Sequence, residues 1–218
     1  MQNIFVAPAG DIRGGLVVCH GGTGLGDHER ALCERFAELG FAAFAPDLFG
    51  EKFRDRAHAM AIIGALVAEP TELRARMMAA HRALRQRVGD AVPVAAVGHC
   101  FGGLAVLELA RSGADVRAVA SVHGGLATQA RATQIHARVL ICTGAADPHA
   151  NGDARAAICD ELEAAGADWQ MLVLGGARHG FTQPGDSYDP AADRRWWRAL
   201  LGLLDEVMPA VAPLARMA

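Results

Sequence analysis

The sequence predicts an α/β fold in which helices cover both faces of a mostly parallel, twisted sheet. Short apolar runs that are typical of buried strands alternate with helical patterns along the whole chain. Most of these runs end in a glycine-containing turn, where a strand of such a sheet connects to the next element. No internal repeat or linker divides the chain. We therefore expect one domain over residues 1–218, with a core over about residues 14–207 and a loose tail over residues 208–218.

The composition is that of a globular protein. Of the 218 residues, 52% are hydrophobic and 21% are charged, and the formal net charge is −3. This charge gives no electrostatic reason to expect a nucleic acid or an anionic membrane as partner. No uncharged run reaches membrane-spanning length, and the first residues lack the pattern of a secretory signal, so we expect a cytoplasmic protein without a membrane segment. The sequence does not define an oligomeric state.

The five cysteines are scattered and contain no C-x-x-C pair, which is typical of reduced thiols. No H-E-x-x-H motif or other grouping of metal ligands occurs, so we expect neither a metal nor another cofactor.

The first part of the chain predicts a βαβ unit. Residues 16–19 predict a buried strand, residues 27–39 a helix that ends at Gly40, and residues 41–45 a second strand. Residues 50–68 combine a charged start with an apolar end, which fits either a mobile cover over a site or a helix with a solvated face; we expect the helix.

The alternation continues to the end of the chain. Helices are expected at residues 71–88, 104–111, 153–165 and 191–207, and strands at residues 94–97, 116–122, 138–143 and 169–174. In parallel sheets ligands bind outside the carboxyl ends of the strands. Residues that directly follow a strand are therefore the candidates for a site.

Residues 98–103, Gly-His-Cys-Phe-Gly-Gly, turn the chain sharply between a strand and a helix. They match the nucleophile elbow G-x-S-x-G with Cys100 in place of serine. Glycines on both sides leave room for a strained turn, and a helix that begins just after Cys100 favours the thiolate. The alternative is an ordinary buried cysteine in a tight turn, but the two flanking glycines favour the nucleophile.

A second glycine-rich loop, His-Gly-Gly-Thr-Gly-Leu-Gly over residues 20–26, follows the first strand. Its spacing misses the dinucleotide fingerprint G-x-G-x-x-G by one residue. An H-G-G loop in this place is what a hydrolase of this architecture uses to offer a backbone N–H to an oxyanion. A flexible turn with spare glycines is the alternative.

A thiol nucleophile needs a base, and the base needs a group that orients it. We expect His179 as the base and Asp147 as its partner, because both follow strands and because the order nucleophile, acid, histidine is that of α/β-hydrolases. Asp47 and Asp153 are alternatives to Asp147 that more plausibly cap a turn and a helix.

The other histidines divide by position. His20, His99 and His123 also follow strands, so we expect them to line the pocket. His149 lies before the last strand, which disfavours it as the base. Surface positions are expected for His28, His58, His81 and His136.

With these residues, the chain resembles the dienelactone hydrolase family of α/β-hydrolases over about residues 16–204. The most specific segments are residues 98–103, 121–126, 144–148 and 179–182. The resemblance implies an α/β-hydrolase fold with Cys100 as nucleophile, His179 as base and Asp147 as its partner. It also implies an oxyanion hole made by the backbone N–H groups of Phe101 and Gly22.

Two positions depart from the family pattern. Gly21 stands where the type enzyme has a glutamate that assists ionisation of the cysteine, and Gln183 stands where it has an arginine that holds the substrate's carboxylate. Recognition of an anionic lactone therefore does not carry over with the triad. Gly21 and Arg178 are the remaining candidates for the substrate pocket, and Arg178 is a possible substitute for that arginine.

The function we expect is cofactor-independent hydrolysis of a small ester or lactone through a cysteine acyl-enzyme, in the manner of a carboxymethylenebutenolidase. A protein that uses Cys100 for redox sensing or ligand binding without turnover is the alternative from another class. A third hypothesis, a nicotinamide-dependent oxidoreductase, is supported only by the glycines of residues 22–26.

Overall fold

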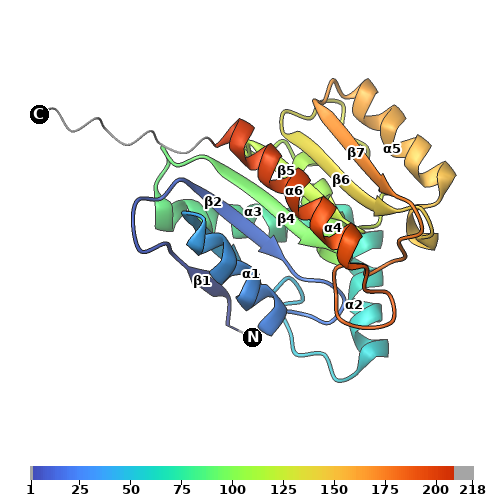
Figure 1. Ribbon diagram of the computed structural model, residues 1–218, viewed down its shortest axis with the longest axis horizontal. Helices are drawn as coiled ribbons and strands as arrows, with labels where there is room; N and C mark the ends of the chain where they lie inside the picture. Colours follow the sequence, from blue (N-terminus) through green and yellow to red (C-terminus); the bar gives the residue numbers. More distant parts are fainter. Residues whose placement is uncertain (1, 209–218) are drawn as a thin grey trace, which may run out of the picture.

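Seven strands form one twisted sheet in the computed structural model, which describes residues 2–208 (Figure 1). The strand order is β1-β3-β2-β4-β5-β6-β7; β1 pairs antiparallel with β3, and all other pairs are parallel. The strands are β1 (Ile4–Val6), β2 (Gly14–Cys19), β3 (Phe41–Ala45), β4 (Val94–His99), β5 (Ala118–Val122), β6 (Arg138–Gly144) and β7 (Trp169–Leu174). The predicted fold class, a mostly parallel sheet within an α/β domain, is confirmed. Only β1 was not expected, because three residues are too few to show a strand pattern.

Helices cover both faces of this sheet. On one face lie α1 (Asp27–Glu38) and α6 (Pro190–Val207), and on the other α3 (Pro70–Val88), α4 (Phe101–Arg111) and α5 (Gly152–Ala164) (Figure 1). The remaining helix, α2 (Arg56–Ala68), packs against α3. Within residues 2–208, no helix is long and apolar enough to cross a membrane.

The sheet separates two hydrophobic cores. Every residue of β2, β3, β4 and β5 is buried, which is why their sequences are continuous apolar runs rather than alternating ones. One core packs side chains such as Phe36 and Trp196 from α1 and α6, and the other packs Met77 and Leu84 from α3 together with most of α4. The central strands are thus fixed on both faces, and their carboxyl ends form a rigid edge.

Two backbone approaches position the turn between β4 and α4. A β-carbon on Gly98 would lie 2.1 Å from the carbonyl oxygen of Gly102, and one on Gly102 would lie 2.3 Å from the carbonyl oxygen of Cys19 in β2. Only glycine allows such contacts. The start of α4 therefore packs directly on the backbone of both β4 and β2.

Residues 50–68 contain a helix, as expected, but its exposed surface is apolar instead of charged. The charged residues lie mostly in the connection that precedes α2. Of the helix itself only Ala59 and Leu66 are buried, and the Met60 side chain is 52% exposed.

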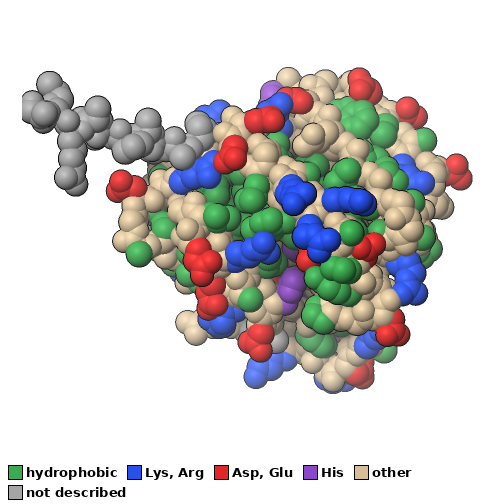
Figure 2. Space-filling model, viewed as in Figure 1, with side chains coloured by type: hydrophobic (Ala, Val, Ile, Leu, Met, Phe, Trp, Pro, Cys, Tyr) green, Lys and Arg blue, Asp and Glu red, His purple; other side chains and the backbone are tan. Residues whose placement is uncertain are grey.

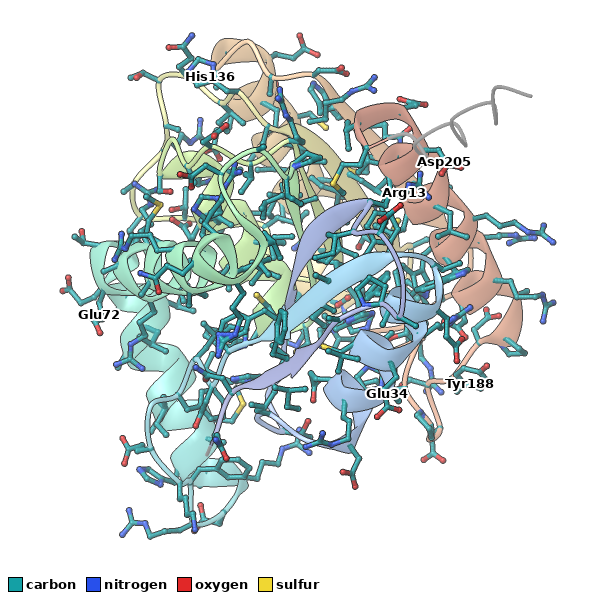
Figure 3. All side chains as sticks on the ribbon, turned by 90° about the vertical axis from the view of Figure 1, so that its left-hand side faces the viewer. Arg13, Glu34, Glu72, His136, Tyr188 and Asp205 are labelled. Atoms are coloured by element: carbon teal, nitrogen blue, oxygen red, sulfur yellow. The ribbon has the colours of Figure 1, made fainter. Side chains whose placement is uncertain are left out.

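The prediction of a loose tail is wrong at its first residue. Met208 is buried against the α1 and α6 side of the sheet, and its carbonyl oxygen accepts a 2.6 Å hydrogen bond from Arg13 Nε. Arg13 also pairs with Asp205 of α6 (Figure 3). Residues 209–218 lie outside the described residues.

The sequence patterns did not reveal a buried ion network between three helices. Arg111 of α4 donates to both carboxylate oxygens of Glu161 in α5, at 2.8 and 2.9 Å, and to Glu108 at 2.9 Å. Glu108 also accepts a 2.7 Å hydrogen bond from Arg74 of α3. Because each buried charge has opposite charges beside it, removal of one partner would leave the others uncompensated.

Charges of both signs are interspersed on the surface over α1 and α6 (Figure 2). The exposed arginines of these two helices are Arg30, Arg35, Arg194, Arg195 and Arg198. The Arg35 guanidinium lies 3.4 Å from the centre of the Trp197 ring, which covers part of that ring with a cation.

We predict that Gly102→Ala lowers the free energy of unfolding by about 1–3 kcal/mol or more, because the added methyl group overlaps the Cys19 carbonyl. Gly202→Ala is the matched control, since a β-carbon at this exposed helical position meets nothing within 4 Å. That variant should be as stable as wild type or up to about 1 kcal/mol more stable. Urea unfolding measures both, and equal stabilities of the two variants would contradict the close approach.

Candidate active site

Three side chains from separate strand ends meet at the carboxyl edge of the sheet. His179 Nε2 lies 3.1 Å from Cys100 Sγ, and His179 Nδ1 lies 2.9 Å from Asp147 Oδ2. Cys100 follows β4, Asp147 follows β6, and His179 follows β7. The other carboxylate oxygen, Asp147 Oδ1, accepts a 2.9 Å hydrogen bond from the backbone N–H of His149. Both oxygens of this buried carboxylate are thus occupied.

The backbone of Cys100 is left-handed, with φ 54° and ψ −117°. A residue other than glycine adopts a positive φ only where the surrounding structure enforces it. Here the contacts at Gly98 and Gly102 enforce it, and α4 starts at the next residue. The half-buried Cys100 thiol therefore sits at the amino end of α4.

Backbone N–H groups also reach the sulfur. Both Gly22, in the loop after β2, and Phe101, the first residue of α4, contribute a backbone hydrogen bond to the Cys100 side chain. These are the two groups that the sequence analysis named as oxyanion donors. The structure brings them together beside Cys100, at the same edge as His179 and Asp147.

The electrostatics favour a thiolate beside a protonated imidazole. Burial by itself would raise the pKa of Cys100, but the hydrogen bond and charge of His179, together with the N–H groups of Gly22 and Phe101, lower that pKa below its ordinary value of 9.0. The hydrogen bonds with Asp147 and then with Cys100 raise the pKa of His179 to about 10. Burial would raise the pKa of Asp147, but the hydrogen bond with His179 outweighs burial and lowers it.

The prediction that His20, His99 and His123 line the pocket is wrong, because all three are at most 1% exposed. His20 Nδ1 donates to the Gly21 carbonyl at 2.8 Å, and its Nε2 accepts from the Leu48 N–H at 3.0 Å, so its ring joins two loops. His99 points to the opposite face of the sheet from α4, where its ring packs against Trp196 and His28.

His123 lies beneath the site rather than in it. Its Nδ1 accepts a 3.1 Å hydrogen bond from the Cys100 N–H, so in the neutral ring Nε2 carries the proton and donates to Thr182 Oγ1 at 2.8 Å. Burial lowers the pKa of His123 to about 3, which keeps the ring neutral. The ring thus connects the turn at Cys100 with the loop that carries His179.

Three of the four surface predictions also need correction. His81 is buried on α3, where its Nε2 lies 3.1 Å from the Asp115 carbonyl oxygen, and His28 is half-buried with an Nε2 atom that has no hydrogen-bond partner. Both lie on helices, where a single histidine shows no pattern that reveals which face it occupies. Of the other two, His136 is exposed and His58 is half-buried.

Arg178 does not point at the thiol. It is exposed, and its guanidinium donates to the Asp186 carbonyl within the same loop. Gln183 is closer to the thiol. A β-carbon built on Gly21 would lie 3.4 Å from Cys100 Cβ and 3.7 Å from Gln183 Nε2. Gly21 is therefore the one pocket candidate that lies against Cys100.

Two neighbours of the site were not expected. The exposed His149 ring lies 4.9 Å from the His179 ring, edge to face. From the other side, Ile63 Cδ1 of α2 lies 3.5 Å from the position of a β-carbon on Gly22. Of these two neighbours, only His149 could have been found from the sequence. It follows Asp147 by two residues, which is the spacing of a turn in which an aspartate side chain accepts from the backbone N–H two residues later.

The other four cysteines lie in different surroundings. Burial raises the pKa of Cys33 and of Cys142 to about 12, and it also raises the pKa of Cys19 and, to a smaller extent, that of Cys159. Among residues 2–208, no group of three or more His, Cys, Asp and Glu side chains is placed to hold a metal ion.

Comparison with known proteins identifies the family. The sequence pattern of the dienelactone hydrolase family matches residues 1–208. An uncharacterised protein of Caenorhabditis elegans is 32% identical over 154 residues, which are 62% of this chain and 94% of the relative.

Solved structures are similar over almost the whole chain. The dienelactone hydrolase-like promiscuous phosphotriesterase P91, from metagenomic libraries, superposes with a TM-score of 0.87 at 37% identity, covering 94% of this chain and 92% of its own. An α/β serine hydrolase homologue from Coxiella burnetii has a TM-score of 0.62 at 16% identity, covering 94% and 90%. The fold is therefore that of the α/β-hydrolases, as the sequence analysis expected.

We predict that iodoacetamide modifies Cys100 before the other four cysteines, because only its pKa is lowered. The rate should rise with pH through a pKa below 9.0 and then level off, since the thiolate is the reacting form. In His179→Ala, burial dominates, the pKa of Cys100 rises, and the rate at pH 7 falls by at least about tenfold.

Mass mapping of the alkylated peptides measures this order, with His136→Ala as a control at an exposed histidine. First modification of another cysteine would contradict the lowered pKa of Cys100, as would an unchanged rate in His179→Ala.

Proposed function

The chain belongs to the dienelactone hydrolase family, and from this premise we propose that it hydrolyses small carboxylic esters or lactones through a cysteine acyl-enzyme. The family match and the 37% identity to the phosphotriesterase P91 support ester hydrolysis. One observation carries the finer proposal: His179 contacts Cys100 Sγ with one ring nitrogen and Asp147 with the other, at 3.1 and 2.9 Å. This arrangement suits a thiol nucleophile, a base and an orienting carboxylate.

Acylation begins from the thiolate and the imidazolium. Cys100 Sγ attacks the carbonyl carbon and forms a C–S bond, while the π electrons of the carbonyl move onto its oxygen. The N–H groups of Gly22 and Phe101 stabilise that oxyanion. The intermediate then collapses, the C–O bond to the leaving group breaks, and His179 Nε2 donates its proton to the departing alkoxide.

Deacylation uses the neutral imidazole that this step leaves. A water molecule attacks the thioester carbonyl and gives a proton to His179 Nε2. Collapse of the second tetrahedral intermediate breaks the C–S bond, releases the acid, and restores the thiolate and the imidazolium. Throughout the cycle, Asp147 holds Nδ1 of the ring and offsets its positive charge. In a lactone, the leaving alkoxide stays attached to the acyl group.

A second candidate activity is phosphotriester hydrolysis, which the 37% identity to P91 favours. The thiolate would attack phosphorus and form a P–S bond, and the P–O bond to the leaving group would break as His179 Nε2 donates its proton. Water would then attack phosphorus and give a proton to His179 Nε2, and the P–S bond would break, which releases the phosphate diester and restores the thiolate. The same N–H donors would stabilise the charge on the phosphoryl oxygen. Wild-type enzyme would release 4-nitrophenol from a dialkyl 4-nitrophenyl phosphate, and no release above buffer would exclude this activity.

For the principal proposal, we predict that 4-nitrophenyl acetate gives a burst of nitrophenol followed by steady turnover. Cys100→Ala should abolish the burst, because no sulfur remains to accept the acyl group. His179→Ala should lower kcat/KM by about 10²- to 10⁴-fold, since it removes the proton donor and base. Stopped-flow absorbance measures both phases, and His136→Ala is the control.

If wild type and Cys100→Ala released nitrophenol at equal rates from every ester and lactone tested, the acyl-enzyme proposal would be excluded. A protein that senses oxidants or binds ligands through Cys100 would then be the better explanation.

A further inference from the structure

In the loop that carries the oxyanion donor Gly22, three glycines lie against uncharged side chains. Ile63 Cδ1 of α2 lies 3.5 Å from the β-carbon position of Gly22, and Gln183 Nε2 lies 3.7 Å from that of Gly21. The ring of Phe53 covers Gly24 and packs edge-on against Phe49, with ring centres 5.7 Å apart. The side chains on this side of the site are thus aliphatic, aromatic or amide side chains.

The α2 helix continues this apolar surface outward. Residues 59–68 of α2 contain no charged side chain. A helix that is apolar on all sides is normally buried, yet here the side chains of Ile62, Ile63 and Val67 are only half-buried and that of Met60 is largely exposed. Apolar surface that stays exposed next to a reactive group is typical of a place where a ligand binds.

Neither Gln183 nor Arg178 supplies a positive charge to a substrate on this side. The Gln183 amide is neutral, and the guanidinium of Arg178 is turned to the Asp186 carbonyl. A negatively charged acyl group placed here would lose hydration without gaining a counter-charge. An aliphatic chain in the same place would gain contact with Ile63 and would give up no hydration of a charge.

We propose that the site takes uncharged esters with a short aliphatic acyl chain, and that Ile63 is the specificity-determining residue that packs against this chain. The inference rests on the proposed function. In that reaction the leaving oxygen faces His179 Nε2 and the carbonyl oxygen faces the N–H of Gly22, so the acyl chain extends away from His179 along the side formed by α2.

Three esters with one leaving group test the proposal: 4-nitrophenyl acetate, butanoate and 4-sulfobutanoate. Wild type should have a kcat/KM for butanoate that is at least about tenfold higher than that for the anionic 4-sulfobutanoate. Ile63→Ala should lower the ratio of kcat/KM for butanoate to that for acetate by roughly five- to tenfold, because the chain loses its contact.

Ile62→Ala is the matched control. It removes the same side chain from the same helix, but Ile62 lines a groove of about 440 Å³ together with Glu69, Glu72 and Arg76, and neither Gly22 nor Cys100 lines that groove. Its ratio should equal that of wild type.

A second pair of variants tests the charge. Gln183→Arg should raise kcat/KM for 4-sulfobutanoate relative to butanoate by about tenfold, because it adds a cation beside Gly21. Gln86→Arg adds the same charge near Asp90 and Asp115, at the amino ends of the strands, and should leave the ratio unchanged.

The outcomes distinguish failure of the proposed ester hydrolysis from failure of the proposed acyl site. If wild type hydrolyses none of the three esters, the proposed function fails and the inference falls with it. If wild type hydrolyses acetate but favours 4-sulfobutanoate over butanoate, ester hydrolysis stands and the apolar acyl site is overturned. The role of Ile63 at an apolar acyl site is likewise overturned if Ile63→Ala and Ile62→Ala shift the butanoate-to-acetate ratio of kcat/KM equally.

Discussion

The strained backbone at Cys100 is the constraint on which the site depends. A cysteine with φ 54° is held in place only because β4, the start of α4 and β2 approach each other at backbone distance through Gly98 and Gly102. The burial of the central strands on both faces makes that contact rigid. One turn therefore orients the thiol and also directs the N–H of Phe101 to it.

The site uses opposed electrostatic effects. Burial alone disfavours the thiolate, as it does in the other cysteines. At Cys100 a positively charged partner and two backbone donors outweigh burial, so the negative charge is stabilised where a nucleophile needs it. Asp147 keeps that partner charged, and the neutral His123 supports the turn from below without adding a second positive charge.

Strand and helix patterns were enough to predict the sheet, its two covered faces and the edge at which Cys100, Asp147 and His179 meet. That edge follows from chain order, because the carboxyl ends of parallel strands share one side of the sheet. The surroundings of the site did not follow in the same way. His20, His99 and His123 lie at strand ends as Cys100, Asp147 and His179 do, but their rings turn into the protein.

Long-range contacts were hidden for a similar reason. The approach of Ile63 to Gly22 depends on how α2 packs on α3, and the network at Arg111 depends on the relative positions of three helices. Neither arrangement leaves a periodic signal in the sequence. Local patterns thus predicted which residues meet at the edge of the sheet, and packing decides what surrounds them.

The most direct test of the account is the identity of the covalent intermediate. Wild-type protein mixed with 4-nitrophenyl butanoate, quenched in acid within milliseconds and digested, should give a butanoyl group on the peptide that contains Cys100. In His179→Ala, which lacks the base that takes a proton from water, the same group should accumulate on a slower time scale. Turnover without an acylated Cys100 peptide, or with the acyl group on another residue, would contradict the account.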